Sequence, residues 1–297
     1  MKIESILTDL HRCGYFDETS HLCGSSLSGS MDRFTPKDIV ETIQSRWLGR
    51  IVCFLREVDS TNDLLVKLAE QAVPQGTVVV ADFQTAGKGR QGRTWSAPPQ
   101  TGLLFSYLIY LGLDTQNIPL ITLAAAVGTA RGLHRLTGIR PGIKWPNDII
   151  VNGKKICGIL AESRLGHDLN GWVIVGIGIN VHIQDHEWPE DLRTTAASIF
   201  QLTDKRFTRN EVFKAVCEEN EKELEVFFAG DTPRVIQNWK EYSVTLGEDV
   251  DVFLPTEILR GNACGITSSG GLMIREENGT VRTIYMGEIS IRHVNKG

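Results

Sequence analysis

The residues best suited to chemistry lie in one glycine-rich, cationic stretch that runs from Gln84 to Trp95. Its glycines allow the backbone to approach a ligand closely and leave N–H groups free to donate hydrogen bonds. Lys88, Arg90 and Arg93 add positive charge. The stretch matches neither common glycine-rich phosphate motif, because Trp95 and two prolines follow it instead of a helix. The pattern predicts an anion-binding loop, and it also fits a basic surface turn or a nucleic-acid contact.

A second stretch, residues 143–162, combines charged side chains with a hairpin signal. The pair Asn-Gly at 152–153 lies between two apolar runs and predicts a two-residue hairpin turn. Lys155 would begin the second strand just after this turn, while Lys144 and Asp148 would lie on either side of a rigid Trp-Pro step. Each of these charged residues also fits a solvated strand end or a turn.

Two further groups of small or polar residues accompany strands. Residues 60–62, Ser-Thr-Asn, lie at a predicted strand-to-helix junction, where one of them would cap the helix. Gly176 and Gly178 fall on the same face of a later strand, and Asn180 follows them. Two glycines on one side of a strand remove side chains where a planar group could pack flat against the backbone.

Apolar patterns predict the elements that must position these residues. Extended runs predict strands at 51–57, 77–84, 103–111 and 172–181. The run 103–111 is apolar at both odd and even positions, so both faces of this strand should be apolar. We therefore expect a strand buried on both faces in a sheet covered by helices. Helical spacing predicts helices within 64–72, 120–136, 212–228 and 234–242.

Composition restricts the class of protein. The chain has 297 residues, of which 41% are hydrophobic and 23% charged, and a formal net charge of −5. These values are typical of a globular protein of two or three domains and argue against wholesale wrapping of nucleic acid. No apolar run is long enough to span a bilayer, and the N-terminus lacks a signal-peptide core. Six scattered cysteines suit reduced thiols. We therefore expect a cytoplasmic protein.

The two ends of the chain differ from the middle. From residue 245 onward, short strand-like runs alternate with glycine and asparagine turns, which predicts a small β-barrel. Residues 1–47 predict a short helix, a Ser/Gly-rich linker and a second helix that starts at Thr35 and places Ile43 and Trp47 on one face. The boundaries we expect are 1–47, 48–242 and 243–297.

A zinc site at the N-terminal end is a weaker hypothesis. Two His-x-Cys pairs could in principle supply four ligands, but their spacing matches no common zinc module. These four residues are His11, Cys13, His21 and Cys23.

Taken together and in order, the motifs resemble those of biotin protein ligases. The glycine-rich signature of that family is similar to residues 87–93, with Lys88 where arginine is more usual. The other matching segments are 58–62 (Val-Asp-Ser-Thr-Asn), 144–148 (Lys-Trp-Pro-Asn-Asp) with 155–160, and 176–180 (Gly-Ile-Gly-Ile-Asn). The likeness runs from about Trp47 to the C-terminus. Lys88 keeps the charge but loses the bidentate phosphate geometry of arginine.

The resemblance implies an α+β fold. A mixed β-sheet with covering helices, similar to class II aminoacyl-tRNA synthetases, would form the catalytic biotin- and ATP-binding domain over 48–242. An SH3-like β-barrel would follow over 243–297. The implied reaction joins biotin and ATP into biotinyl-5′-AMP and then transfers biotin to a specific lysine of a carboxylase biotin carrier domain.

The resemblance also implies roles for individual residues. The biotin pocket would comprise Ser60, Thr61, Asn62, Gln84, Gly87, Lys88, Gly89, Arg90, Lys155 and Gly158. The nucleotide would contact Arg93, Trp95, Asn147, Gly176, Gly178 and Asn180. The catalytic residues would be Arg90, Lys155, Asp148, Lys144 and Arg93. Mg²⁺ would accompany ATP, although no protein ligand for it can be named.

Several alternatives stay open at this point. Many bacterial members of the family also carry an N-terminal winged helix-turn-helix and act as repressors. No three-helix pattern with a basic recognition helix is visible in residues 1–47, so we expect no complete DNA-binding domain and no specific operator binding. A bifunctional ligase and repressor is the alternative, and a lipoate or octanoyl ligase is another. A homodimer is compatible with the sequence, and we expect no membrane partner.

Overall fold

The computed structural model describes residues 43–112, 118–165 and 171–292. The predicted first helix, the Ser/Gly-rich linker and both His-x-Cys pairs lie outside these residues. The helix predicted from Thr35 is wrong at its C-terminal end, because residues 43–47 form coil and the start of a turn. Backbone N–H groups of this segment are bound by carboxylates of a distant helix, so a tertiary contact determines its conformation.

A seven-stranded mixed sheet forms the centre of the molecule, with the order β1-β2-β3-β7-β6-β5-β4. Only β1 and β2 are paired in parallel, and the other pairs are antiparallel. The strands are β1 (Val52–Val58), β2 (Val78–Gln84), β3 (Gly102–Gly112), β4 (Gly142–Lys144), β5 (Asp148–Val151), β6 (Lys154–Leu165) and β7 (Gly171–Asn180). The Asn152-Gly153 hairpin is confirmed, since both residues have positive φ between β5 and β6.

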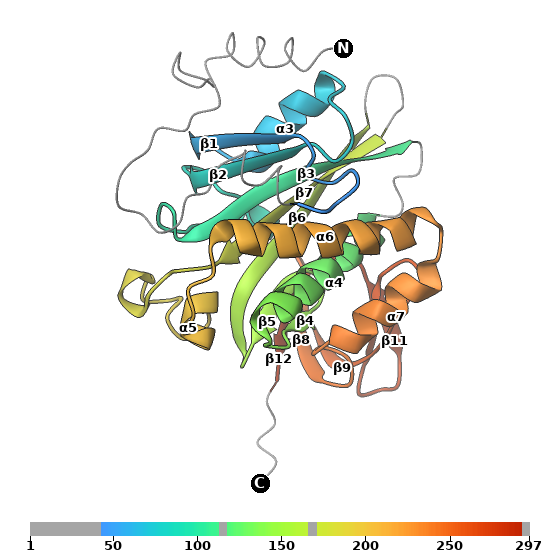
Figure 1. Cartoon of the computed structure of the whole chain (residues 1–297). Helices are drawn as coiled ribbons and strands as arrows, with labels where there is room; N and C mark the ends of the chain where they lie inside the picture. The colour runs from blue at the N-terminus through green and yellow to red at the C-terminus, as the bar shows by residue number, and fades with distance from the viewer. Residues whose placement is uncertain (1–42, 113–117, 166–170, 293–297) are drawn as a thin grey trace.

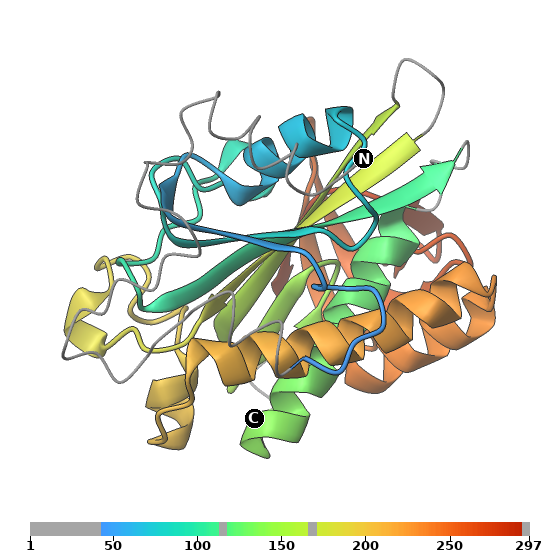
Figure 2. The ribbon, with the colours of Figure 1, turned by 45° about the horizontal axis from the view of Figure 1, so that its top comes forward.

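Helices cover both faces of this sheet, as predicted from the doubly apolar strand β3. One face is packed by α3 (Thr61–Glu70), and the other by α4 (Ile118–Thr137), α6 (Arg209–Phe228) and α7 (Thr232–Tyr242) (Figures 1 and 2). Strand β2 shows the division, because Val78 and Val80 pack on the α4 and α6 side while Val79 and Ala81 pack on the α3 side. Shorter helices are η1 (Arg90–Gly92), η3 (Asp185–Glu187) and α5 (Ile199–Thr203).

The C-terminal part is a separate antiparallel sheet of order β11-β10-β9-β8-β12. Its strands are β8 (Asp249–Phe253), β9 (Ile258–Ile266), β10 (Leu272–Arg275), β11 (Val281–Ile284) and β12 (Glu288–Ile291). All five match strand-like runs in the sequence, and closure into an SH3-like barrel stays a prediction. Trp145 joins this sheet to the main domain, because its backbone N–H donates to Thr245 Oγ1 at 2.9 Å and its indole N–H donates to the Gly270 carbonyl at 3.3 Å.

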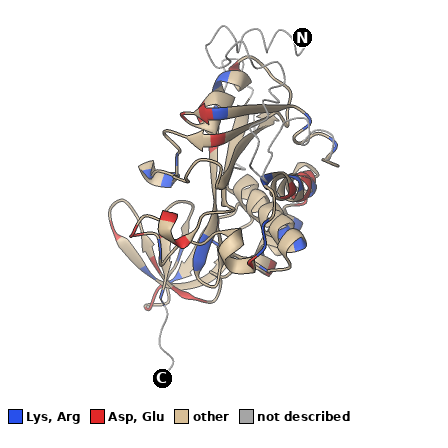
Figure 3. Cartoon of the chain, turned by 60° about the vertical axis from the view of Figure 1, so that its left-hand side comes forward, with Lys and Arg blue, Asp and Glu red and all other residues tan. Residues whose placement is uncertain are grey.

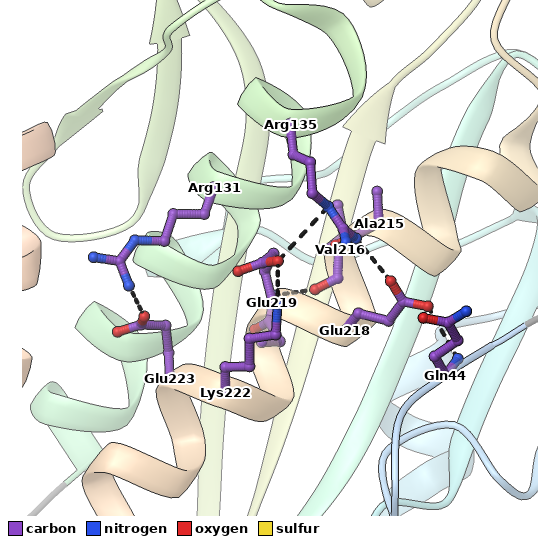
Figure 4. Close-up of polar contacts among 10 residues, drawn as sticks. Gln44, Arg131, Arg135, Ala215, Val216, Glu218, Glu219, Lys222 and Glu223 are labelled. Atoms are coloured by element: carbon purple, nitrogen blue, oxygen red, sulfur yellow. Dashed lines mark hydrogen bonds and ion pairs between the residues drawn. The ribbon is translucent and has the colours of Figure 1, made fainter.

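The contact between α4 and α6 is rich in ion pairs (Figure 4). Arg131 of α4 pairs with Glu223 of α6, and Arg135 Nη2 lies 2.8 Å from Glu218 Oε2. The two helices approach closely because Gly128 of α4 has no side chain, and a Cβ there would lie only 2.6 Å from the Asn220 Cα. Burial raises the pKa of the Glu223 carboxyl.

Carboxylates of α6 also hold the chain just before β1. The Glu221 carboxylate accepts hydrogen bonds from the backbone N–H groups of Arg46, Trp47 and Leu48, at 2.7, 2.8 and 2.9 Å. Glu218 accepts a fourth, from the Gln44 N–H at 3.0 Å. Segment 44–48 is therefore fastened to α6 by carboxylates.

No helix among the described residues is long and apolar enough to cross a membrane.

Candidate active site

One cleft of about 860 Å³ brings the predicted site residues together. Every one of them lines it except Gly87, whose backbone packs against the backbone of Trp95. Five cationic side chains face the cleft against three acidic ones, so its net charge is positive although the chain as a whole is acidic. The cations are Lys88, Arg90, Arg93, Lys144 and Lys155, and the acids are Asp148, Glu248 and Glu288.

The charges come from elements that are far apart in the sequence. Figure 3 shows Lys and Arg positions in blue on the loop after β2 and on the strands of the β5–β6 region. The loop is held above the sheet by its own hydrogen bonds, in which the Gly89 N–H donates to the Arg93 carbonyl at 2.7 Å and the Trp95 N–H donates to the Gly87 carbonyl at 2.9 Å. The predicted cationic loop is therefore a compact hairpin whose side chains reach the cleft.

A neutral polar network closes one end of the cleft at the start of α3. The Gln84 Oε1 accepts from the Thr61 backbone N–H at 2.7 Å and lies 3.0 Å from the Thr61 hydroxyl. Ser106, which the sequence analysis did not identify, lies behind them with its hydroxyl 2.5 Å from Asn62 Oδ1. Ser60 has the capping role that the sequence predicted, because its side chain accepts from the Asp63 N–H.

The two glycines of β7, which were predicted to pack against a planar ligand, contact side chains in this structure. A Cβ at Gly176 would overlap the Asn62 amide, and one at Gly178 would overlap the Trp95 indole. Gly158, opposite Gly178 on β6, also contacts the indole. The flat surface that the glycines predicted is therefore real, but in this structure Trp95 and Asn62 pack on it. The Trp95 Nε1 is buried and has no hydrogen-bond partner among the described residues.

Lys155 and Asp148 form the central ion pair of the cleft, with Nζ 2.6 Å from Oδ1. Lys155 Nζ also lies 5.5 Å from the centre of the Trp95 ring. Lys144 is opposite Asp148 on the neighbouring strand, and burial lowers the pKa of its ammonium, although Asp148 acts in the opposite direction. An incoming anion would favour the charged form of Lys144, since opposite charges raise the pKa of an ammonium.

Two asparagines of the predicted nucleotide set have structural partners here. Asn147 donates to the Ile159 carbonyl at 2.6 Å and accepts from Arg90 Nη1 at 3.2 Å, so it orients Arg90. Burial lowers the pKa of Arg90, but an arginine stays charged at neutral pH. Asn180 donates to the Ala197 carbonyl at 3.1 Å.

The remaining cations of the loop have acidic partners at the edges of the cleft. Lys88 Nζ lies 2.5 Å from Asp63 Oδ1 at the start of α3. Arg93 pairs with Glu288 of β12, so the C-terminal sheet contacts the cationic loop directly. Both pairs are substantially exposed, and such pairs exchange partners easily.

Sequence reasoning missed the part of the cleft wall that comes from the segment after β7. This wall includes Trp188, Leu192, Thr195 and Ala196. It is joined to β6 by hydrogen bonds between the backbones of Lys155 and residues 195–197. No glycine pattern or charge pattern marks the segment, and only the tertiary pairing brings it to the site.

Among the described residues, no cluster of three His, Cys, Asp or Glu could hold a metal ion.

Two family models match the chain. Residues 54–180 match the biotin/lipoate A/B protein ligase family, and residues 245–292 match the biotin protein ligase C-terminal domain. The first range contains most of the cleft, and the second contains the C-terminal sheet.

Whole-chain comparisons agree with these models. The bifunctional ligase/repressor BirA of Bacillus subtilis is 30% identical over 285 residues, which cover 96% of this chain and 87% of the relative. The biotin--[acetyl-CoA-carboxylase] ligase of Mycobacterium tuberculosis is 29% identical, with 75% and 84% covered. The solved biotin protein ligase of Aquifex aeolicus, in complex with biotin and ATP, is 33% identical with a TM-score of 0.68, and 82% of this chain and 99% of that chain are covered. Sequence, fold and cleft therefore agree that the chain belongs to the family of biotin protein ligases.

Proposed function

We propose that this chain condenses biotin with ATP to biotinyl-5′-AMP and then transfers the biotinyl group to a lysine of a carboxylase biotin carrier domain. The observation that carries this proposal is one cleft with a neutral polar network at one end and five cations along its wall. A ligand with a neutral ring system at one end and a carboxylate at the other is complementary to this arrangement.

The first step requires two anions to meet. A carboxylate oxygen of biotin attacks the α-phosphorus of ATP, and pyrophosphate leaves. Arg90, Arg93 and Lys155 offset the repulsion between these groups and stabilise the charge of the transition state. Lys88 and Lys144 extend the same positive field. We assign Lys155 to the carboxylate and the α-phosphate because it projects from a rigid strand end just beyond the β5–β6 turn.

The biotin head would lie at the neutral end. Ser60, Thr61, Asn62 and Gln84 would hydrogen-bond its ureido ring, and Gly87, Gly89 and Gly158 would let the backbone come close to the bicycle and its chain. The adenylate would be bound through Arg93, Asn147, Gly176, Gly178 and Asn180. Trp95 would leave its present place on Gly178 and cover the adenine, because no described residue accepts a hydrogen bond from its buried indole N–H where it now lies.

The second step is attack of the carrier lysine amine on the mixed anhydride, with AMP as the leaving group. Asp148 faces the cleft and is bound to Lys155, so it could either orient the amine or accept its proton. Mg²⁺ would be held mainly by ATP phosphates and water, since the described residues offer no cluster of ligands. The carrier domain is the protein partner that this chemistry requires.

The free cysteines indicate the cellular compartment of the enzyme. Cys53, Cys157, Cys217 and Cys264 are free thiols, and free thiols suit a reducing compartment. We propose the cytoplasm. We further propose that 48–242 and 243–297 act as the catalytic and C-terminal domains, and that dimer formation is not needed to complete the described cleft.

Substrate-dependent release of pyrophosphate tests the proposal. The purified chain is incubated with ATP, Mg²⁺ and either biotin or lipoate. We expect release with biotin and none above background with lipoate. Release with lipoate alone would assign the chain to the other branch of the matched family, and release with neither would remove the proposed activity.

A second function, repression of transcription, is favoured by one comparison. The match to the Bacillus subtilis ligase/repressor covers 96% of the chain and so extends into the residues before 43. We nevertheless propose a ligase without specific operator binding, on the sequence pattern of residues 1–47. A gel-shift with a biotin-operon operator, biotinyl-AMP and competitor DNA tests this, and a specific shift that resists added salt would establish the bifunctional alternative.

A further inference from the structure

One edge of the C-terminal sheet lies inside the cleft. Strand β12 is the last strand in the order β11-β10-β9-β8-β12 and is paired with β8 alone among the described strands. All four of its residues line the cleft. Strand β11, at the other edge of the sheet, does not line it. The cleft wall therefore includes a sheet edge, where backbone groups are left without a strand partner.

The pairing register shows which backbone groups of β12 face the cleft. The Arg292 N–H donates to the Asp249 carbonyl at 2.8 Å, and the antiparallel register places Ser290 at the next hydrogen-bonded position. In an antiparallel pair, such residues alternate with residues whose N–H and C=O groups point away from the partner strand. The N–H and C=O groups of Ile289 and Ile291 therefore point away from β8 and along the cleft wall.

Core packing holds these groups in position. The Ile289 side chain is buried in the hydrophobic core, and the Ile291 side chain packs against it. Side chains of a strand alternate between its two faces, so Glu288 and Ser290 project from the outer face. The strand is thus anchored by its isoleucines, and its free backbone groups are already ordered before any ligand binds. Preformed groups of this kind cost little entropy to use in binding.

The alternation of the free groups indicates the kind of ligand that fits. Ile289 and Ile291 each offer one donor and one acceptor, and the two sets are about 7 Å apart along the strand. A phosphate or carboxylate only accepts hydrogen bonds, so the carbonyl oxygens of this edge would repel it. An extended peptide has the same alternation of donors and acceptors, and it can pair with the edge as an added strand.

The edge lies beside the charged groups of the proposed reaction. Glu288, the first residue of β12, pairs with Arg93 of the cationic loop and also interacts electrostatically with Lys144. A peptide strand paired with β12 would therefore pass close to these cations. A lysine side chain on that strand would project from the cleft wall toward the groups that bind the activated carboxylate.

An exposed apolar pair lies next to this edge on the outer face of the sheet. Phe253 of β8 is opposite Glu288, and Ile258 of β9 is opposite Phe253. Both apolar side chains are exposed. Exposed apolar side chains that lie together are typical of protein interfaces. The surface beside the cleft thus fits a folded domain that presents an extended segment to β12.

We infer that the free edge of β12 is the docking strand for the carrier domain, which pairs an extended segment beside its acceptor lysine with the backbone of Ile289 and Ile291. This inference rests on the proposed transfer of biotin to a carrier domain. It assigns recognition of the protein substrate to main-chain groups, which no side-chain motif in the sequence reveals.

Amide hydrogen exchange, measured for each residue by NMR, tests the inference. The chain with bound biotinyl-AMP is compared alone and with saturating biotin carrier domain of an acetyl-CoA carboxylase, in which arginine replaces the acceptor lysine so that no transfer occurs. Strand β11 is the internal control. Its register leaves the Val281 and Thr283 N–H groups pointing away from β10, at the edge that does not line the cleft.

We expect the Ile289 and Ile291 amides to exchange at least about tenfold more slowly when the carrier domain is bound, and the Val281 and Thr283 amides to exchange at the same rate as before. Unchanged exchange at both isoleucines would overturn the inference. Slow exchange without carrier domain that depends on protein concentration would assign the edge to a second copy of this chain, which would also overturn it.

The Ile289→Pro variant provides a second test, because proline removes the outward N–H and leaves the bonds between β12 and β8 in place. Ile289→Ala loses core packing as well but keeps the N–H, so the comparison of the two variants isolates this group. The KM for the unmodified carrier domain should be at least about fivefold higher in Ile289→Pro than in Ile289→Ala. Equal values would contradict the docking strand.

Pyrophosphate release by the parent, with biotin and ATP but no carrier domain, reports the first reaction step separately. Its absence would contradict the proposed function. Its presence together with unprotected Ile289 and Ile291 would contradict only the docking strand, so the two failures are distinguishable.

Discussion

The cleft and the α4–α6 contact both concentrate charge, but they use it in opposite ways. In the cleft, cations outnumber acids, and pairs such as Arg93 with Glu288 are largely exposed. Helix α6 buries four glutamates: Glu218, Glu219 and Glu223 are paired with arginines of α4 (Figure 4), and Glu221 is bound by backbone N–H groups of segment 44–48. Glu221 alone receives three backbone hydrogen bonds.

The charges of the cleft serve function, and the buried charges of α6 serve stability. Lys88 and Arg93 each have a single carboxylate partner at the edge of the cleft, and a ligand anion can replace it. The buried carboxylates of α6 are already bound by backbone N–H groups and arginine side chains, so no ligand is needed to satisfy them. Substitutions in the cleft should therefore change rates with little effect on folding, and substitutions on α6 should do the reverse.

The largest effect should come from Lys155→Ala. Loss of this preorganised charge should slow formation of biotinyl-AMP by about 2–4 kcal/mol of barrier, or roughly 30- to 1,000-fold. Single-turnover release of pyrophosphate measures this step. Lys154→Ala removes a cation from the neighbouring position, whose ammonium binds the Arg193 carbonyl and does not line the cleft, and should leave the rate within about twofold of the parent. A normal rate in Lys155→Ala would refute the assigned role.

On the other side of the comparison, Glu221→Ala should destabilise the fold without altering catalysis at 25 °C. Three N–H groups lose their acceptor, which should cost about 3 kcal/mol and lower the thermal midpoint by about 6–12 °C. Calorimetric unfolding measures the loss. Glu225→Ala removes a more exposed carboxylate of the same helix, which pairs with Arg46, and should cost less than about 1 kcal/mol. Equal losses in the two variants would show that burial does not distinguish these carboxylates.

Arg90→Gly should weaken the retention of biotinyl-AMP in the cleft. Arg90 reaches the cleft from a loop, so we expect loop closure over the adenylate to depend on it. Its loss should speed dissociation of biotinyl-AMP about 10- to 100-fold and increase random biotinylation of added proteins. Stopped-flow release and blotting measure the two effects, with Gln91→Gly as the control in the same loop. Retention as tight as in the parent would contradict the role.

The smallest effect should come from Glu288→Gln, which releases Arg93 from its partner. An exposed pair contributes at most about 1 kcal/mol, so the KM for ATP should fall by no more than about fivefold. Glu248→Gln removes the same charge from the cleft wall without releasing an arginine. If both variants change KM equally, the net charge of the cleft is responsible and the Arg93 pair is not.

Much of the fold was predictable from the sequence because its elements have strong local signals. The apolar runs predicted β1, β2, β3 and β7, and the Asn152-Gly153 turn predicted the β5–β6 hairpin. The short strand β4 carries only three residues and gives no such signal. Residues 43–47 were predicted as helix because Ile43 and Trp47 have helical spacing, but Glu221 binds the backbone N–H groups there.

The site was predictable where charge or glycine marks the chain and unpredictable where only packing decides. Lys155 and the loop cations stand out by type and spacing, and they do line the cleft. Ser106 and Glu162 occur in ordinary strand sequences, so only the structure shows that they meet Asn62. Glu288 lies in the other sheet, and its contact with Arg93 depends on how the two sheets pack.

The fastening of segment 44–48 also defines how mechanical force would pass through the molecule. A pull on the chain from its N-terminal side reaches Glu218 and Glu221 of α6 before it reaches β1. The neighbouring residues also contact the start of β2, because the Gly49 N–H donates to the Gly76 carbonyl at 2.9 Å. This entry segment therefore behaves as an anchor point that shares a load between α6 and the edge of the sheet.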